Sequence, residues 1–323
     1  MPHATGDRDV LQSLHNHAAG IVVNIVATAA QIYLGPLYYK MPYYTFILTG
    51  EGWVQELLDG HPCQIKTELS MQQHVFQSLV QALVSSGLRP SKHILNEEQV
   101  AIFLYGSVTG LSIRHLGKWF QHSNDTISHY YQVVLQHLSS SPFYPKYVHL
   151  PLVGSPPPIE IQSNLKFFPF FEGAIGAMDG MHISCCPSAA KPELSCNHKG
   201  WMSQNCLACC SFDMLFQYML SRWDGSAADA AIFNNVQQSD LRVPDGWYYL
   251  ADAGFGACES LLVPYQGVRY HLAEWGWAGL WPANHEELYN LQHSSVCNAV
   301  EQIFGILKCR CVHCSIDLYC CWF

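Results

Sequence analysis

Hydrophobic and polar positions predict helices along the first half of the chain. Apolar residues recur at helical spacing from Met71 to Val84, which is typical of an amphipathic helix. The segment from Asn96 to Leu138 predicts three more helices, of which the second is Ser112 to Phe120 and the third is opened by Ser123 or Asn124. Such a trio is compatible with a helix-turn-helix DNA-binding region, although the pattern alone slightly favours a three-helix packing module without DNA contact. The third helix would be the recognition helix, with its polar residues Asn124, Asp125, Ser128 and His129 facing outward.

The stretch before these helices predicts one further helix. Met1 to His17 is polar and has no apolar period, so we expect a frayed end there. Ala18 to Tyr33 predicts a helix of about the minimum length that spans a membrane, but Asn24 and Gln31 interrupt its apolar run. We therefore expect no membrane partner. A connector rich in Pro and Tyr, Gly35 to Tyr44, follows.

The second half alternates strands with helices, after a stretch rich in Ser and Pro that predicts an extended linker. The order is strand, hairpin, helix, strand and then helices to the end. This order predicts an α/β fold, an RNase H-like mixed sheet flanked by helices, preceded by an all-α helix-turn-helix region. The domains we expect are a tail and helix at 1–34, a helical, helix-turn-helix-like region at 35–138, the linker at 139–169 and an RNase H-like domain at 170–323.

Three carboxylates occupy unusual places in this pattern. Asp179 lies in the apolar run Gly173 to Cys185, where we expect a buried strand with the acid at its carboxyl end. Asp252 ends a second apolar strand, and Glu301 lies on a predicted helix. A buried charge is costly unless it is paired or bound to a cation, and three such acids can converge on two divalent cations. Oxygen ligands favour Mg²⁺ or Mn²⁺. Taken singly, Asp179 and Asp252 are more simply explained as acids of turns and Glu301 as part of a solvated helix face, but two of the three end apolar strands.

Composition narrows the class of protein. The 323 residues are 49% hydrophobic, which is ample for a globular core. A formal net charge of −9 with 16 Lys and Arg argues against an obvious basic surface for DNA. The 14 Cys are irregularly spaced in a long chain without a signal-peptide pattern, so reduced thiols inside a cell are expected rather than a secreted disulfide framework.

Several motifs together carry a family resemblance that covers the chain from about residue 31 to 308. The chain resembles the PIF/Harbinger transposases, DDE superfamily endonucleases, in the form common among fungal genomes. The stretches that resemble the family are Gly176 to His182, Ser203 to Ala208, Trp223 to Asp229, Tyr249 to Gly254, Leu262 to Tyr265, Gly267 to His271 and Asn298 to Gly305.

The resemblance implies a function and a site. Asp179, Asp252 and Glu301 would be the catalytic, metal-binding DDE triad, and Val100 to Leu138 would be the family's helix-turn-helix. The implied chemistry is metal-dependent cleavage of DNA at transposon ends and transfer of a 3′-hydroxyl to target DNA. The implied partners are DNA, a Myb-like DNA-binding protein and further copies of the chain, and the implied location is the nucleus, with the cytoplasm as a second one.

Departures from the family pattern support an alternative, a catalytically inactive, decayed or domesticated DNA-binding protein. Ala228 stands where the family usually has His, and Cys297, Gln302, Cys309 and Cys311 stand where it has basic residues. Single C-to-T changes convert Arg codons to Cys, Trp, Gln or His codons, which suggests decay of a mobile element. The family usually continues beyond residue 323, so we also expect a truncated copy.

Three minor sets of residues have simpler interpretations. A zinc site is the alternative for the last thiols, but they lack a matched second pair at finger spacing; this set is Cys309, Cys311, His313, Cys314, Cys320 and Cys321. Four histidines could assist near the metals, although each is more often a structural His: His182, His198, His271 and His293. Cys185, Cys186, Cys209 and Cys210 are expected in the core.

Overall fold

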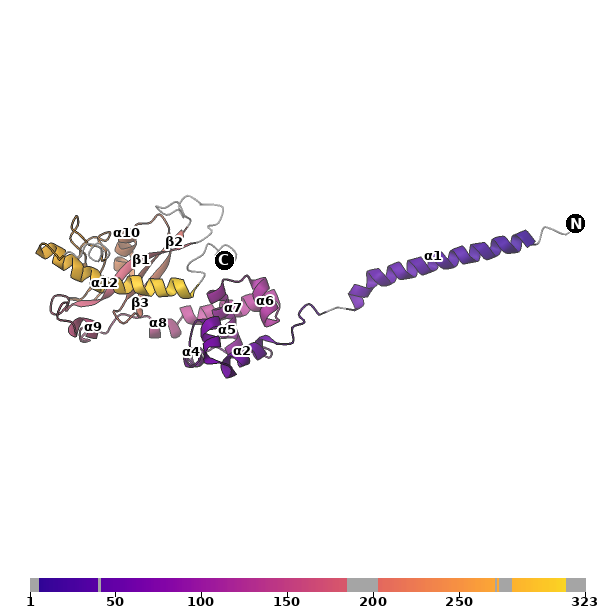
Figure 1. Cartoon of the computed structure of the whole chain (residues 1–323), viewed down its shortest axis with the longest axis horizontal. Coiled ribbons are helices and arrows are strands. Elements are labelled where there is room, and N and C mark those ends of the chain that lie inside the picture. The colour runs from indigo at the N-terminus through magenta and orange to yellow at the C-terminus, as the bar shows by residue number, and fades with distance from the viewer. Residues whose placement is uncertain (1–5, 40–41, 185–202, 271, 273–280, 312–323) are drawn as a thin grey trace. The chain divides into compact units, whose positions relative to one another are not determined.

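The computed structural model describes residues 6–39, 42–184, 203–270, 272 and 281–311 (Figure 1). The chain divides into two compact units, Met1–Ile47 and Leu48–Phe323. Among the residues named above, those that lie outside the described ranges include Cys185, Cys186, His198 and His271.

The first unit contains one helix, α1 (Gly6–Tyr38), which is longer at both ends than expected. The polar residues before Ala18 are helical, because a missing apolar period does not disfavour a helix that contains no Pro there. Pro36 lies in the last turn, so the helix ends soon after the backbone hydrogen bond that the Pro ring removes. At this length, the stretch Val10–Gly35 is long and apolar enough to cross a membrane, which corrects the judgement made on the shorter Ala18–Tyr33.

The second unit begins with a helical region in which sequence signals set most helix ends. Gly110 ends one helix in the left-handed conformation at φ 67°, as its place in the sequence predicts. Ser123 caps another by accepting a hydrogen bond from the Thr126 backbone N–H at 3.2 Å. The helices are α2 (Gly50–Asp59), α3 (Pro62–Leu69), α4 (Gln73–Ser85), α5 (Asn96–Thr109), α6 (Ile113–Phe120) and α7 (Asn124–Ser139).

Residue preferences alone favour Gly60 with Pro62 as a helix stop and Asn96 as an N-cap, and the structure corrects both expectations. Pro62 does not only stop α2 but also begins α3, because the first helical position needs no backbone donor. Leu95, not Asn96, is the N-cap of α5, and Asn96 is the first helical residue. Boundaries of this kind depend on backbone angles that residue preference alone does not fix.

A buried ion pair ties α5 to the turn between α6 and α7. Glu98 is 1% exposed, and its Oε1 lies 2.8 Å from Nε2 of His122 in that turn. The carboxylate also lies against Gly50 at the start of α2, where an added Cβ would meet Glu98 Oε1 at 2.1 Å. Three segments of the helical region therefore meet at one carboxylate.

We expect His122→Ala to lower the free energy of unfolding by about 1–3 kcal/mol, because it leaves the Glu98 carboxylate buried without this partner. Urea denaturation at pH 7 followed by circular dichroism measures the change. The double variant Glu98→Gln with His122→Ala should lose less, since no buried charge is left behind. An equal decrease in the free energy of unfolding in the single and the double variant would contradict a role for the Glu98–His122 pair.

The stretch expected to be an extended linker contains two short helices, α8 (Phe143–Tyr147) and α9 (Ile159–Gln162). Ile161 is fully buried in the core of the sheet region. Phe143 packs against the core of the helical region, and the Tyr144 hydroxyl donates a hydrogen bond to the Met219 carbonyl at 3.5 Å. Buried apolar residues within the Ser- and Pro-rich segment explain why it is folded rather than extended.

A five-stranded mixed sheet follows, in the order β3-β2-β1-β4-β5. β1 pairs antiparallel with β2 and β2 antiparallel with β3, which is the predicted hairpin, while β4 pairs in parallel with β1 and β5. The strands are β1 (Ala174–Ser184), β2 (Ser203–Cys210), β3 (Phe216–Asp224), β4 (Tyr248–Leu250) and β5 (Leu261–Leu262).

Helices cover both faces of this sheet. Alternate strand residues Ala208 and Leu250 pack with apolar residues of α12 (His285–Arg310), which crosses the strands in Figure 1. Their neighbours Cys209 and Ala251 pack on the other face with α10 (Asp229–Ser239). Cys209 and Cys210 are core residues, as predicted. An all-helical region followed by a mixed sheet with helices confirms the predicted RNase H-like α/β fold class.

Candidate active site

Asp179 lies within β1 and not at its end, which corrects the expected position. β1 pairs with the parallel strand β4 only up to Ala177, but its second half pairs antiparallel with β2 up to Ser184. Asp179 therefore comes just after the parallel pairing ends. It lies between Ala177 and Met181, whose side chains pack in the core that α12 covers, so alternation places Asp179 on the α12 face.

Asp252 reaches the same face from the neighbouring strand. Leu250, the last residue of β4, packs with α12, and Ala251 packs on the opposite face. Alternation returns the next residue, Asp252, to the α12 face, where it is exposed. The Gly254 backbone N–H donates a hydrogen bond to its Oδ1 at 2.9 Å and holds the carboxylate at this edge.

Glu301 comes from α12 itself. Cys297 and Phe304, one turn before it and about one turn after it, are buried against the sheet. Glu301 is exposed and so lies at the margin of this packed face. All three acids predicted from the sequence are thus on the α12 side of the sheet.

The charges of these acids meet at Asp179. Burial and, after it, the negative charges of Asp252, Asp229 and Glu301 together raise the pKa of Asp179 to about 7, against the lowering effect of the Gly180 backbone N–H, which donates to Asp179 Oδ1 at 2.7 Å. Within the described ranges, however, no three His, Cys, Asp or Glu side chains are grouped closely enough to hold a metal ion. The acids therefore interact through their charges without forming a closed set of ligands.

Asp229 is an acid of this site that the sequence did not single out. It opens α10 on the other face of the sheet, and its Oδ1 accepts a hydrogen bond from Nδ2 of the buried Asn205 at 2.6 Å. The carboxylate fills the space beside Gly180, where an added Cβ would lie 2.1 Å from Asp229 Oδ1. The signal available in the sequence was the acid at a helix start, in a stretch that belonged to the family motifs.

A polar network lies next to the acids. His293 is fully buried and donates from Nε2 to the Leu262 carbonyl at 2.9 Å, so that Nδ1 is the acceptor, 3.4 Å from the Tyr270 hydroxyl. Burial lowers the pKa of His293 to about 4, which keeps it neutral. The Tyr270 hydroxyl also hydrogen-bonds the Cys297 thiol, and burial, followed by the charge of Asp179, raises the pKa of that thiol. His293 is therefore a structural histidine, which is the simpler of the two interpretations that the sequence allowed.

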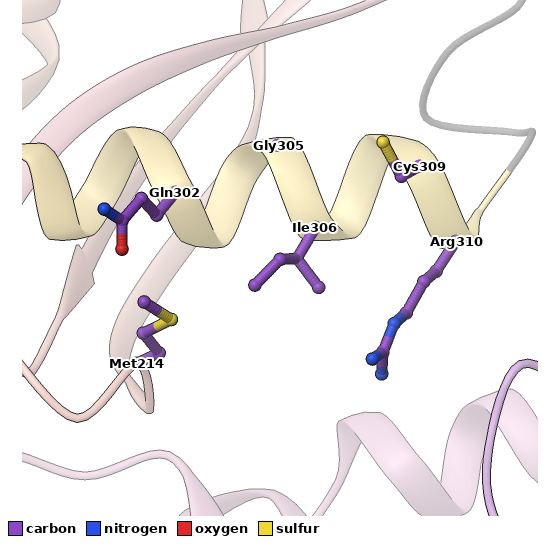
Figure 2. Close-up of a pocket in the computed structure, with 6 residues that line it drawn as sticks. All are labelled: Met214, Gln302, Gly305, Ile306, Cys309 and Arg310. Carbon is purple, nitrogen blue, oxygen red and sulfur yellow. The ribbon is translucent and has the colours of Figure 1, made fainter.

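The positions expected to have lost basic residues do not all border the acids. Cys297 is at the site, but Gln302 and Cys309 line a pocket of about 490 Å³ together with Met214 from the turn between β2 and β3 (Figure 2). Figure 2 shows Gln302 and Cys309 on the C-terminal part of α12 and Met214 beside that helix. Of the residues named as an alternative zinc site, Cys309 is exposed and Cys311 is half-buried. The others lie outside the described residues: His313, Cys314, Cys320 and Cys321.

Of the last two helices of the helical region, α6 carries exposed cations, whereas the predicted recognition helix α7 contains no Lys or Arg. Arg114 and Lys118 are exposed on α6. On α7, Asn124, Asp125 and His129 are exposed as expected, whereas Ser128 is half-buried. The charge that a DNA backbone would meet therefore lies one helix earlier than the side chains proposed for base contacts.

Comparisons with known proteins agree with this arrangement. Residues 178–319 match the family described as "DDE superfamily endonuclease", and residues 45–140 match a "Domain of unknown function (DUF8040)". The chain is 30% identical over 144 residues to "Putative nuclease HARBI1" of Rattus norvegicus and 28% identical over 145 residues to that of Homo sapiens. Each match covers 43% of this chain and 37% of the relative. No solved structure gives a significant match.

The matched family region contains all three predicted acids and most of the sheet that carries them. The resemblance inferred from the motifs is thus confirmed by two independent comparisons. The chain carries a DDE superfamily endonuclease domain and is distantly similar to HARBI1, a Harbinger-derived protein.

Proposed function

We propose that the chain is a divalent-metal-dependent DNA endonuclease of the transposase type, with Asp179, Asp252 and Glu301 as its catalytic and metal-binding residues. The observation that carries this proposal is the meeting of the three acids on one face of the sheet, where the charges of two raise the pKa of the third. No cationic neighbour is among the causes that set the pKa of Asp179. The three carboxylates therefore repel one another, and a bound cation would relieve this repulsion.

The donor atoms suit the proposed cation. Each acid offers hard carboxylate oxygens, which Mg²⁺ and Mn²⁺ prefer. When bound, such ions would supply Lewis-acid catalysis of phosphodiester cleavage. Because the acids are not grouped at binding distance in the described part of the chain, the proposal requires that their side chains close on the ion.

The three acids differ in what they can do. Asp252 and Glu301 are exposed and can reach a DNA backbone, whereas Asp179 is half-buried and gives the ion a fixed position on the strand. Glu301 can also accept the proton of the attacking hydroxyl or water. A bound cation favours the charged form of Asp179, so that binding should release a proton near neutral pH.

Asp229 would be a positioning residue rather than a ligand. Its carboxylate is fixed by the Asn205 amide and packs against Gly180, the residue that follows Asp179, from the other face of the sheet. Asn205 also donates to the Ala227 carbonyl at 3.1 Å, which ties the start of α10 to β2. This arrangement supports the backbone that carries Asp179.

DNA is the proposed substrate, and transposon ends are its proposed form. The matched family description supports a nuclease acting on DNA, and the exposed Arg114 and Lys118 of α6 support contact of the helical region with phosphates. The overall charge of −9 implies that these contacts are local rather than spread over the whole surface.

Mn²⁺ binding by calorimetry tests the proposal. We expect the full chain to bind Mn²⁺ and the double variant Asp179→Asn, Asp252→Asn to bind at least about tenfold more weakly, since two oxygen donors are lost. Asp245→Asn with Glu259→Gln is the matched control, because it removes two exposed acids outside the site. If neither the intact chain nor the control binds Mn²⁺, the alternative of an inactive, decayed transposase-derived protein is favoured.

A further inference from the structure

The long helix α1 exposes an apolar surface that nothing in its own unit covers. Every described side chain from Val10 to Leu34 is exposed; Ile21, for example, is 49% exposed and Ile32 73%. α1 belongs to the first unit, and the sheet belongs to the second. So large an apolar surface is unfavourable in water and indicates an interaction with another apolar phase.

The distribution of apolar residues around α1 identifies the kind of partner. Ile21, Val22 and Val23 are consecutive, and consecutive residues point about 100° apart around a helix, so apolar side chains face every direction. A partner helix would cover only one narrow seam of such a surface. From Val10 to Gly35 there is no Asp, Glu, Lys or Arg that would mark a water-facing side. Only an apolar environment that surrounds the whole helix would cover this surface. The hydrocarbon core of a lipid bilayer is such an environment.

The length and ends of the helix fit a bilayer. The 26 residues of Val10–Gly35 extend about 39 Å at 1.5 Å per residue, compared with a hydrocarbon core about 30 Å thick. Arg8 precedes this stretch, and Tyr38, Tyr39 and Lys40 follow it, which are residue types enriched where a spanning helix meets the headgroups. The amides Gln12, Asn16, Asn24 and Gln31 are uncharged, so their cost in lipid is much lower than that of a charge, and Ser13, His15 and His17 lie near the end of the stretch that follows Arg8.

We propose that α1 inserts into a lipid bilayer and anchors the chain to a membrane. This inference departs from the expectation of no membrane partner, which rested on the shorter stretch from Ala18 to Tyr33. It is independent of the proposed nuclease activity, because α1 contributes no residue to the acidic site.

Flotation of the full chain with phosphatidylcholine vesicles tests the proposal. We expect the chain to float with the vesicles and to stay bound in 1 M salt, about the level at which surface charge attraction is screened. The double variant Val22→Asp, Ile25→Asp should reduce the bound fraction at least about tenfold, because two charges would enter the hydrocarbon. Leu152→Asp with Val153→Asp is the matched control, since both residues are exposed apolar ones outside α1, and it should float like the parent chain.

Three outcomes would overturn the proposal. The first is a chain that stays in the lipid-free fraction, and the second is flotation that the Val22 and Ile25 variant retains. The third is binding only to vesicles that contain anionic lipid and only at low salt, which would indicate surface adsorption by cationic side chains. A lipid-free chain whose mass by light scattering shows an oligomer, lost in the same variant, would assign α1 to self-association instead.

Discussion

Replacing Asp179 with Asn is expected to reduce Mg²⁺- or Mn²⁺-dependent DNA cleavage by at least about a hundredfold, because supporting residues around a metal site already cost ten- to a hundredfold and Asp179 would be a ligand. The substitution keeps the size of the side chain and removes its charge. Cleavage of supercoiled plasmid by the full chain measures the loss. Asp245→Asn, which changes an exposed acid, is the control and should cleave normally. Unchanged cleavage by Asp179→Asn would refute the assignment.

The same substitution is expected to stabilise the protein when no cation is present. Burial and the neighbouring acids raise the pKa of Asp179 from 3.8 to about 7, so the folded state holds a proton that the unfolded state has lost between these values. The free energy of unfolding therefore falls by about 1.4 kcal/mol per pH unit as the pH rises through this window. Asp179→Asn removes this loss, so its melting temperature at pH 8 in EDTA should exceed that of the parent chain.

His293 makes the pH dependence of the variant distinctive. Burial lowers its pKa from 6.5 to about 4, so between these values the unfolded state binds a proton that the folded state does not. Its contribution therefore raises the free energy of unfolding as the pH rises from about 4 to 6.5 and opposes that of Asp179. The parent chain should show little slope from this pair below pH 6.5, whereas Asp179→Asn should show the rising slope of His293 alone. A parallel pH dependence in both proteins would contradict the raised pKa of Asp179.

The sequence predicted the site more closely than the backbone that carries it. Strand alternation and apolar runs were enough to identify Asp179, Asp252 and Glu301 as candidates, and the structure brings them to one face. The position of Asp179 within β1 was not predictable, because it depends on how far β1 pairs with β2 beyond its pairing with β4. The register depends on how two strands pair, so the sequence of one strand alone does not determine it.

Other features escaped prediction for related reasons. Asp229 belongs to the site only because Gly180 leaves room for its carboxylate across the sheet, a contact between residues 49 positions apart. The length of α1 escaped because its first turns are polar, and helical periodicity detects only helices that pack one face. In both cases the outcome depends on which surfaces pack against each other, and not on the local structural preferences of the residues.

Replacing Gly180 with Ala is expected to reduce cleavage by about ten- to a hundredfold and the free energy of unfolding by about 1–3 kcal/mol. The added Cβ would lie 2.1 Å from Asp229 Oδ1 and 2.4 Å from its Cγ, so one of the two must move. The Asn205 amide and the first turn of α10 hold Asp229, so part of the shift should fall on the strand next to Asp179. Gly256→Ala is the control, because nothing lies within 4 Å of a Cβ at that position.

Substitutions of Asp229 separate a steric from a positioning role. Asp229→Ala should remove the clash, so combining it with Gly180→Ala should restore stability relative to Gly180→Ala alone, with a coupling of about 0.5–3 kcal/mol. Asp229→Asn keeps the shape and removes a charge that raises the pKa of Asp179, so the pH at which cleavage begins should fall. A purely structural role would leave this pH profile unchanged. If Asp229→Asn cleaves with the parent's profile and the double variant gains nothing, Asp229 does not act on Asp179, and Gly180 is required for another reason.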